Sequence, residues 1–357
     1  MRRRDFFELS AALAAAQAPG ARAATPPIRM KLGSQHADTD AILKTMAAFG
    51  VNHICVRTPS KVLDENWSVE GLTRLREHIE SFGLTAEMIE MPTNSALTTS
   101  AIKNVLIGKS PERDREIDAF CQMLRNVSRA GIPRAKYNLT ILMVERTEPT
   151  PGRGGAMYST WDYERAQAKD PPLTEAGPVS ADAAWEHITY FLERVAPAAQ
   201  EYKVKIACHP HDPAIPGGKP FRGVHRVMAS VDGLKRFVSI KENPYHGLNF
   251  CQGTVSEMLD RPGEQIYDVI RYFGERNKIF NVHFRNILGN RLEFSEVAID
   301  EGSFNAARAI ATFKEVGYEY MVQHDHNVQA AGETNPNAYA AFVHGYIKAL
   351  IQYAELA

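Results

Sequence analysis

Four residues whose side chains can bind a metal stand at the ends of four short apolar runs. His209 ends the run VKIACH and Cys251 ends GLNFC. His283 lies near the end of KIFNVHF, and Asp325 follows closely on YMVQ. Two imidazoles, one thiolate and one carboxylate are good ligands for first-row divalent metals. Each alone is weak evidence, because a strand histidine is commonly a satisfied core residue and a buried cysteine a small hydrophobe.

The spacing of these residues is more informative than their types. The steps from 209 to 251, from 251 to 283 and from 283 to 325 are 42, 32 and 42 residues. In a parallel β/α barrel, one strand with its helix takes about 30 residues. Each step is therefore one unit plus a loop, and the four side chains fall at one rim of the barrel. The sequence predicts a divalent-metal site there. Cys208 should face away and pack, because side chains alternate along a strand.

The elements that must position these residues alternate regularly along the chain. Short β-branched or aromatic runs predict strands at Ile28–Gly33, His53–Arg57, Thr85–Met91, Ala135–Leu142, Val204–His209, Gly247–Cys251, Lys278–Phe284 and Tyr320–Gln323. Helical periodicity predicts helices at Thr39–Phe49, Val69–Phe82, Pro111–Ala130, Ala181–Tyr202, Val231–Ile240, Gly263–Gly274, Phe304–Val316 and Ala338–Ala354. Eight such pairs predict a single-domain α/β fold, the (β/α)8 TIM barrel. We expect the long connections 145–180, 210–230 and 285–302 to be structureless functional loops.

Composition narrows the possible functions. The chain has 357 residues, a net charge of -1 and 44% hydrophobic residues, which suits one large globular domain. The sequence has no basic stripe of the kind that nucleic-acid-binding proteins carry, which argues against a nucleic-acid partner. No apolar run past the N-terminus approaches the ~20 residues of a membrane span.

The first residues have the pattern of an export signal. Arg3-Arg4, followed by Phe6-Phe7, a mildly apolar stretch and Ala21-Arg22-Ala23, resembles a bacterial twin-arginine signal. We therefore predict a signal at residues 1–23, a catalytic barrel at residues 24–357 and a periplasmic location. The four cysteines have no CxxC spacing, and nothing in the sequence assigns a disulfide.

Further polar residues should surround the predicted metal. Arg285 is two residues after His283 and can clamp a carboxylate in two-point fashion. His326 directly follows Asp325 and can serve as a general acid or base. Tyr339 can supply a phenol from the last loop. Two more residues are candidates for substrate binding: Asn138 in the fourth strand and Arg146 in a Gly- and Pro-rich lid.

Several segments of the chain resemble the mannonate dehydratase family, metal-dependent lyases on a TIM barrel related to xylose isomerase-like enzymes. The segments, in family order, are Asn66–Glu70, Tyr137-Asn138, Val204–Pro213, Phe250–Gly253, Val282–Arg285, Asp325-His326 and Thr334–Pro336. The resemblance implies that His209, Cys251, His283 and Asp325 hold the metal, and that His326 and Tyr339 transfer protons. It leaves open which of these two is base and which acid.

The implied reaction is β-elimination of water from a sugar acid such as D-mannonate, giving a 2-keto-3-deoxy acid. The resemblance suggests Mn²⁺, whereas the thiolate ligand favours Zn²⁺ or Fe²⁺ on softness grounds. The expected partner is the small sugar acid, and a homodimer stays open. Departures from the family, such as His211 within HPHDP and Val297–Asp300, surround the substrate rather than the metal.

Two other functions remain possible at this point. The first is a metal-dependent sugar isomerase or epimerase of the xylose isomerase-like class, which often has a carboxylate-rich site. The second is an exported sugar-binding or metal-storage protein, although storage has no need of proton-transfer residues.

Overall fold

The computed structural model describes residues 30–35, 39–93, 97, 100–168, 173–215, 218–329, 331–332 and 338–356. The predicted export segment and the Thr334-Asn335-Pro336 motif lie outside these residues. Within the described part of the chain, no helix combines the length and the apolar character that a membrane span requires.

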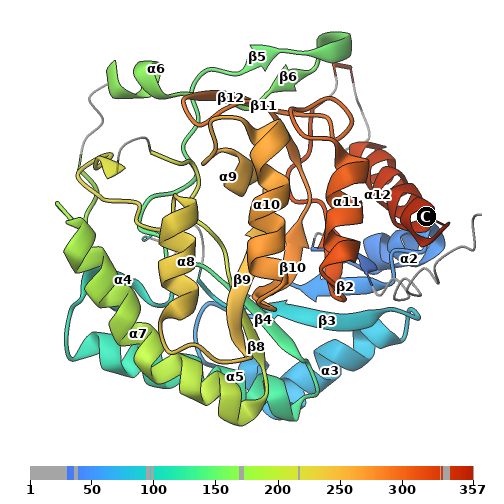
Figure 1. Cartoon of the computed structure of the whole chain (residues 1–357). Coiled ribbons are helices and arrows are strands. Elements are labelled where there is room, and N and C mark those ends of the chain that lie inside the picture. The colour runs from blue at the N-terminus through green and yellow to red at the C-terminus, as the bar shows by residue number, and fades with distance from the viewer. Residues whose placement is uncertain are drawn as a thin grey trace, which may run out of the picture.

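Eight parallel strands of the described residues close a barrel (Figure 1). The order around it is β1-β13-β10-β9-β8-β4-β3-β2, so each strand lies beside the next barrel strand of the sequence. The strands are β1 (Lys31–Ser34), β2 (His53–Val56), β3 (Thr85–Glu90), β4 (Arg134–Tyr137), β8 (Lys205–Cys208), β9 (His246–Cys251), β10 (Ile279–His283) and β13 (Met321–Gln323). The predicted TIM barrel is confirmed.

Helices cover the outside of the barrel. They are α2 (Asp40–Phe49), α3 (Val69–Glu80), α4 (Lys103–Ile107), α5 (Glu112–Arg129), α7 (Ala181–Tyr202), α8 (Val231–Ser239), α10 (Pro262–Gly274), α11 (Ala306–Glu315) and α12 (Ala338–Leu356). Side chains cap several N-termini, and the hydroxyls of Ser68, Ser180 and Ser230 each accept a backbone N–H of the first turn. These caps explain why the predicted starts of α3, α7 and α8 agree with the structure.

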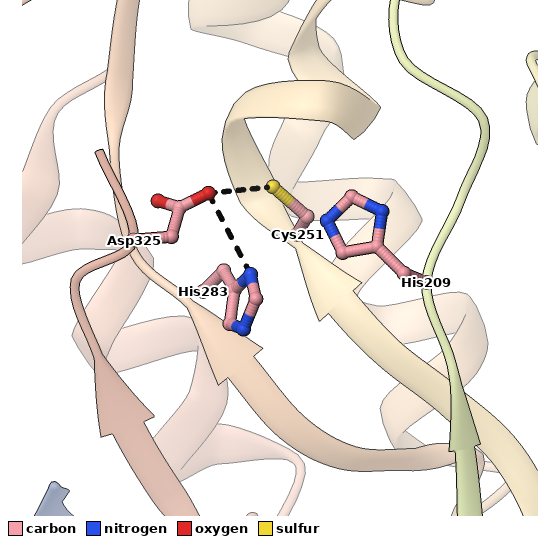
Figure 2. Close-up of side chains that lie close together, drawn as sticks. All are labelled: His209, Cys251, His283 and Asp325. Atoms are coloured by element: carbon pink, nitrogen blue, oxygen red, sulfur yellow. Dashed lines mark hydrogen bonds and ion pairs between the residues drawn. The ribbon is translucent and has the colours of Figure 1, made fainter. Parts of the chain in front are cut away.

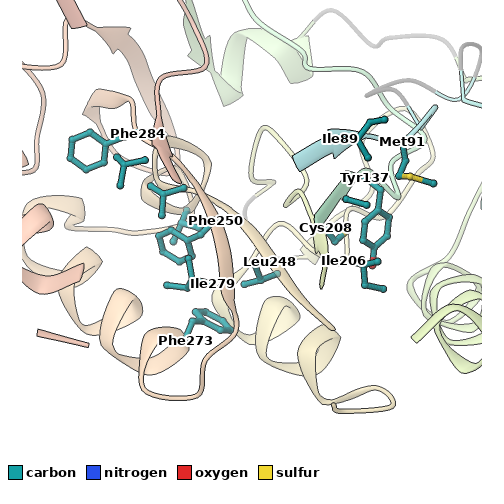
Figure 3. Close-up of a cluster of buried hydrophobic side chains, with 14 of the residues drawn as sticks. Ile89, Met91, Tyr137, Ile206, Cys208, Leu248, Phe250, Phe273, Ile279 and Phe284 are labelled. Carbon is teal, nitrogen blue, oxygen red and sulfur yellow. The ribbon is translucent and has the colours of Figure 1, made fainter. Parts of the chain in front are cut away.

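The main core lies between the strands and these helices. Leu248 and Phe250 of β9 point outward from the barrel and pack against Phe273 of α10 and Ile279, and Tyr137, Ile206 and Cys208 form part of the same cluster (Figure 3). Cys208 is thus a packing residue, as predicted. A smaller apolar group fills the middle of the barrel: Cys55, Met88, Ala207, Phe280 and Met321. Polar side chains can therefore occupy the inside of the barrel between this apolar layer and the carboxyl ends of the strands.

Two of the three long connections contain structure that was not predicted. The segment after β4 forms β5 (Thr150–Pro151), β6 (Met157–Tyr158), β7 (Thr160–Asp162) and α6 (Tyr163–Ala168), and the segment after β10 forms β11 (Asn286–Gly289) and β12 (Glu293–Val297). Strand β12 pairs with both β11 and β7 in an antiparallel sheet. These elements lie together at one end of the barrel, at the top of Figure 1. The expectation of structureless loops was therefore wrong, because Trp161 and Phe294 give this sheet its own buried apolar cluster.

Candidate active site

Four strand ends bring His209, Cys251, His283 and Asp325 together (Figure 2). One ligand atom from each lies within 4.8 Å of those of the others. Cys251 is level with His283 in the pairing of β9 and β10, and His283 is level with Gln323 in β13. Strand β9 passes directly into the short helix α9 (Gln252–Ser256) at Cys251, so its thiol stays at the strand end.

Both histidines of this group present a nitrogen that can bind a metal. Nδ1 of His209 lies 2.7 Å from the carbonyl oxygen of Pro210, so it donates there and leaves Nε2 as the ligand atom. Nδ1 of His283 is buried and has no hydrogen bond to any described residue. It lies 3.6 Å from Oδ2 of Asp325, and the Cys251 Sγ lies 3.4 Å from that same oxygen. An orphaned nitrogen facing a carboxylate and a thiol fits a bound cation.

The far nitrogen of His283 faces a pair of buried amides. Nε2 lies 3.2 Å from Nδ2 of Asn249, and Oδ1 of Asn249 accepts from Asn281 at 2.7 Å. Oδ1 of Asn281 has no partner among the described residues. Amide oxygen and nitrogen are assigned from such networks. Turning both amides over keeps both of these contacts, with His283 Nε2–H donating to Asn249 and Nδ1 left for a metal.

Burial sets the charge of the ligands. It lowers the pKa of His209 to about 4 and that of His283 to about 3, so both rings are neutral near pH 7, the form that binds metals. Burial also raises the pKa of the Cys251 thiol. Burial alone would raise the pKa of Asp325, but His326 and Arg285 outweigh it and hold that pKa well below its usual range.

Arg285 connects the ligand group to a second buried cluster. Its Nε donates to Oδ2 of Asp325 at 3.1 Å, and its Nη2 donates to Asp212 and Glu257 at 2.8 Å each. The side chain passes beneath α9 at Gly253, where an added Cβ would lie 2.5 Å from Arg285 Cγ. Gly253 is therefore required for the close approach. The guanidinium is occupied by protein carboxylates.

The second cluster contains three carboxylates: Asp212, Glu257 and Glu296. Arg146 binds both oxygens of Asp212, at 2.7 and 3.1 Å, and also contacts Glu296. Burial and the neighbouring Asp212 raise the pKa of Glu257 to about 8. Two guanidinium groups already bind these carboxylates, so the cluster does not fit a second metal.

His326 lies beside both clusters. Its Nδ1 is 2.7 Å from Oε2 of Glu296, and its Nε2 is 3.9 Å from Oδ2 of Asp325. Burial lowers the pKa of His326, but Asp325 and Glu296 outweigh it and raise the pKa above the ordinary value. Glu296 fixes the ring through Nδ1, which leaves Nε2 for proton transfer.

A cavity of about 190 Å³ opens on the ligand group. His209, His283, Asp325 and His326 line it, and so does Asn138, whose amide donates to the carbonyl of Thr93 at 2.9 Å. The other sequence candidates are placed differently. Arg146, Arg285 and Tyr339 are absent from the described lining. Burial raises the pKa of the Tyr339 phenol, which therefore stays protonated.

Sequence reasoning missed several residues of this site. Asp212 lies in a loop, Glu257 at the end of α9 and Glu296 in β12. In these segments no periodic pattern of the sequence indicates which way a side chain points. Lys136 and Glu90 also line the cavity. Lys136 is two residues before Asn138 in the predicted strand Ala135–Leu142, so alternation was a signal that both face the lumen. His211, a departure from the family, is buried with Nε2 on the Leu139 carbonyl at 2.8 Å and supports the loop.

Comparison with known proteins gives a consistent set of relatives. The sequence profile of the D-mannonate dehydratase (UxuA) family matches residues 34–171 and 159–353. Mannonate dehydratase of Thermotoga petrophila is 26% identical over 314 residues, which cover 78% of this chain and 82% of the relative. Mannonate dehydratase 2 of Halalkalibacterium halodurans is 28% identical over 310 residues, which cover 77% and 83%.

Solved structures show the same fold. Mannonate dehydratase from Streptococcus suis serotype 2 superposes with a TM-score of 0.76 at 22% identity, covering 92% of this chain and 93% of that one. A D-tagatose 3-epimerase-like protein superposes with a TM-score of 0.59 at 13% identity, covering 92% and 98%. At these identities the likeness concerns the fold.

Proposed function

Because the chain belongs to the mannonate dehydratase family of hydro-lyases, we propose that it removes water from a sugar acid such as D-mannonate in a metal-dependent reaction. The observation that carries this proposal is the convergence of four ligand-type side chains beside a cavity that three of them line together with His326. The ligands account for binding a cation, and His326 accounts for moving a proton beside it.

The metal-binding residues in this proposal are His209, Cys251, His283 and Asp325. The orphaned Nδ1 of His283 and the neutral state of both imidazoles support it. A divalent metal held there supplies a Lewis acid that stabilises negative charge on the substrate oxygens. We propose Mn²⁺ from the family, with Fe²⁺ and Zn²⁺ as the alternatives that the thiolate favours.

The reaction breaks a C–H bond next to the carboxylate and the C–O bond of the neighbouring hydroxyl. The hydroxyl leaves as water, and the enol that remains tautomerises to a 2-keto-3-deoxy acid. His326 exchanges a proton with the substrate at Nε2, because Glu296 engages Nδ1. Tyr339 remains a candidate for the second proton transfer, in which its protonated phenol would act as the acid.

Arg285 has a different role in this proposal from the carboxylate clamp expected from the sequence. Its contacts to Asp325, Asp212 and Glu257 make it a positioning residue that orients the ligand carboxylate. Arg146 likewise binds Asp212 and Glu296, so it orients the cluster that holds His326 in place.

A panel of sugar acids tests the function. The protein is loaded with Mn²⁺ and given hexonates and pentonates, and the products are examined by mass spectrometry and by semicarbazide trapping of 2-keto acids. We expect a product that has lost one water, with D-mannonate among the substrates. A product of unchanged mass would instead support an isomerase or epimerase. No product from any acid would support a binding or storage protein.

A further inference from the structure

One positively charged side chain, that of Lys136, lines the cavity beside the ligand group. It has no role in the mechanism proposed above. Among the described residues that line this cavity, Lys136 is the one lysine or arginine. Its side chain is only 9% exposed and rises from β4, the neighbour of the strand that leads to His209. Lys136 lines the same cavity as His209 and His283.

The surrounding arginines are bound to protein groups instead. Arg285 and Arg146 bind the carboxylate cluster described above, and Arg226 donates to the backbone carbonyls of Asp212 and Met143. A carboxylate that enters the cavity therefore meets the ammonium of Lys136 rather than a guanidinium.

Two side chains hold this ammonium without saturating it. Nζ donates to Oε1 of Gln35 at 2.8 Å and lies 3.4 Å from Oε1 of Glu90. A lysine ammonium has three N–H donors, and these contacts within the described residues use at most two. The remaining donor is available to a ligand.

We propose that Lys136 binds the substrate carboxylate and thereby restricts the site to acids. This inference rests on the proposed function, because it assigns the residue that recognises the acid group of the same substrate. Gln35 and Glu90 position the ammonium, and Glu90 also disfavours a second anion at that position. The matching ligand is a compact hydroxy acid with one terminal carboxylate.

The test compares binding of a charged ligand with that of its neutral counterpart. The probes are the 3-deoxy analogue of D-mannonate, which lacks the leaving hydroxyl and cannot lose water, and the amide of that acid. Calorimetry measures both dissociation constants for the Mn²⁺-loaded wild type, Lys136→Met and Lys136→Met/Glu90→Gln. Lys205→Met serves as the control, because that lysine lies at the start of β8 and donates to the Pro244 carbonyl.

In both Lys136 variants, we expect affinity for the acid to fall about tenfold to a hundredfold while affinity for the amide changes less than about twofold. Lys205→Met should change neither. Equal losses for acid and amide, unchanged affinity for the acid, or recovery of acid binding in the double variant would overturn the proposal. The last result would mean that the freed Glu90 carboxylate repelled the ligand. If the wild type bound neither probe and dehydrated no sugar acid, the proposed function itself would fail.

Discussion

Arg285 Nε donates to Oδ2 of Asp325 at 3.1 Å, and both side chains are only 4% exposed. The same carboxylate oxygen lies 3.4 Å from Cys251 Sγ and 3.6 Å from His283 Nδ1. The guanidinium thus binds an oxygen of a proposed metal ligand, as the outer partners of metal ligands do. This contact joins the ligand group to the carboxylate cluster.

Removing this contact should weaken metal binding. For Arg285→Met we expect Mn²⁺ affinity to fall about tenfold to a hundredfold, because the Asp325 carboxylate loses its orienting donor. Chelator competition measures this affinity. If metal affinity stayed unchanged while KM for the sugar acid rose, Arg285 would be a substrate clamp after all.

Adding a single methyl group at Gly253 tests the same contact of Arg285 with a smaller change. An added Cβ there would lie 2.5 Å from Arg285 Cγ, so the guanidinium must shift. We expect Gly253→Ala to lower metal affinity in the same direction as Arg285→Met, by roughly tenfold. Gly345→Ala is a suitable control, because a Cβ at that helical position has no atom of the described residues within 4 Å. Equal metal affinity in the two glycine variants would contradict the proposed role of Arg285.

His326 should be required for turnover and not for metal binding. In His326→Asn we expect kcat to fall by about 10²–10⁴, the usual contribution of a positioned acid or base. Metal content, measured by atomic absorption, should remain that of the wild type. Glu296→Gln should lower kcat less, because it only orients the His326 ring. Unchanged turnover in His326→Asn would end this assignment.

Ion pairs at the end of the barrel away from the candidate active site should affect stability but not activity. Glu87 is buried there between Lys31 at 2.7 Å, His53 at 3.1 Å and Arg134. Glu87→Gln leaves the buried guanidinium of Arg134 without its carboxylate and should cost about 3–5 kcal/mol of unfolding free energy. Urea unfolding measures this loss. We expect kcat/KM to stay within about twofold, since function in such barrels lies at the other rim. A large fall in activity of the folded variant would contradict this division.

Buried histidines should make the protein sensitive to acid. Burial lowers the pKa of His246 to about 4, and its Nε2–H donates to the Phe237 carbonyl at 3.0 Å. The unfolded chain has the higher pKa, so this stabilisation is complete above about pH 6.5 and is lost as pH falls toward 4. The loss amounts to about 2–3 kcal/mol at pH 4.5.

His246→Gln provides the comparison, because its amide N–H can replace the Nε2–H donor. Urea unfolding of the metal-free proteins at pH 7.5 and 4.5 should show a smaller loss of stability in the variant. If both proteins lost the same free energy, His246 would not be the cause.

Much of the barrel could be predicted because local signals and tertiary packing agree. Helix α7 has the predicted bounds, since Ser180 caps its first turn and one face is apolar. Strand β4 is shorter than predicted and ends at Tyr137. There the backbone N–H of Asn138 donates to the Thr93 hydroxyl instead of to a neighbouring strand. The convergence of the four ligand residues followed from spacing because parallel strands end at one rim.

The rest of the site depends on contacts between residues far apart in the chain, which the periodicity of apolar residues in the sequence cannot predict. Glu296 reaches His326 only because β12 pairs with β7, which belongs to a connection that follows a different barrel strand. Arg285 follows its strand as expected, but the carboxylates that bind it come from four separate segments. Lys136 was overlooked because a lysine in a short strand usually lies in solvent, whereas here Gln35 and Glu90 stabilise it inside the barrel.

The most direct test follows activity against metal occupancy. Protein stripped by a chelator is given Mn²⁺ stepwise, and the initial rate of 2-keto acid formation from D-mannonate is plotted against metal bound per chain. We predict that the rate rises in proportion to bound metal and levels off at one metal ion per chain. In Cys251→Ala, both tight Mn²⁺ binding and the reaction should be abolished. A rate that survives complete removal of metal, or no 2-keto acid at full occupancy, would contradict the account.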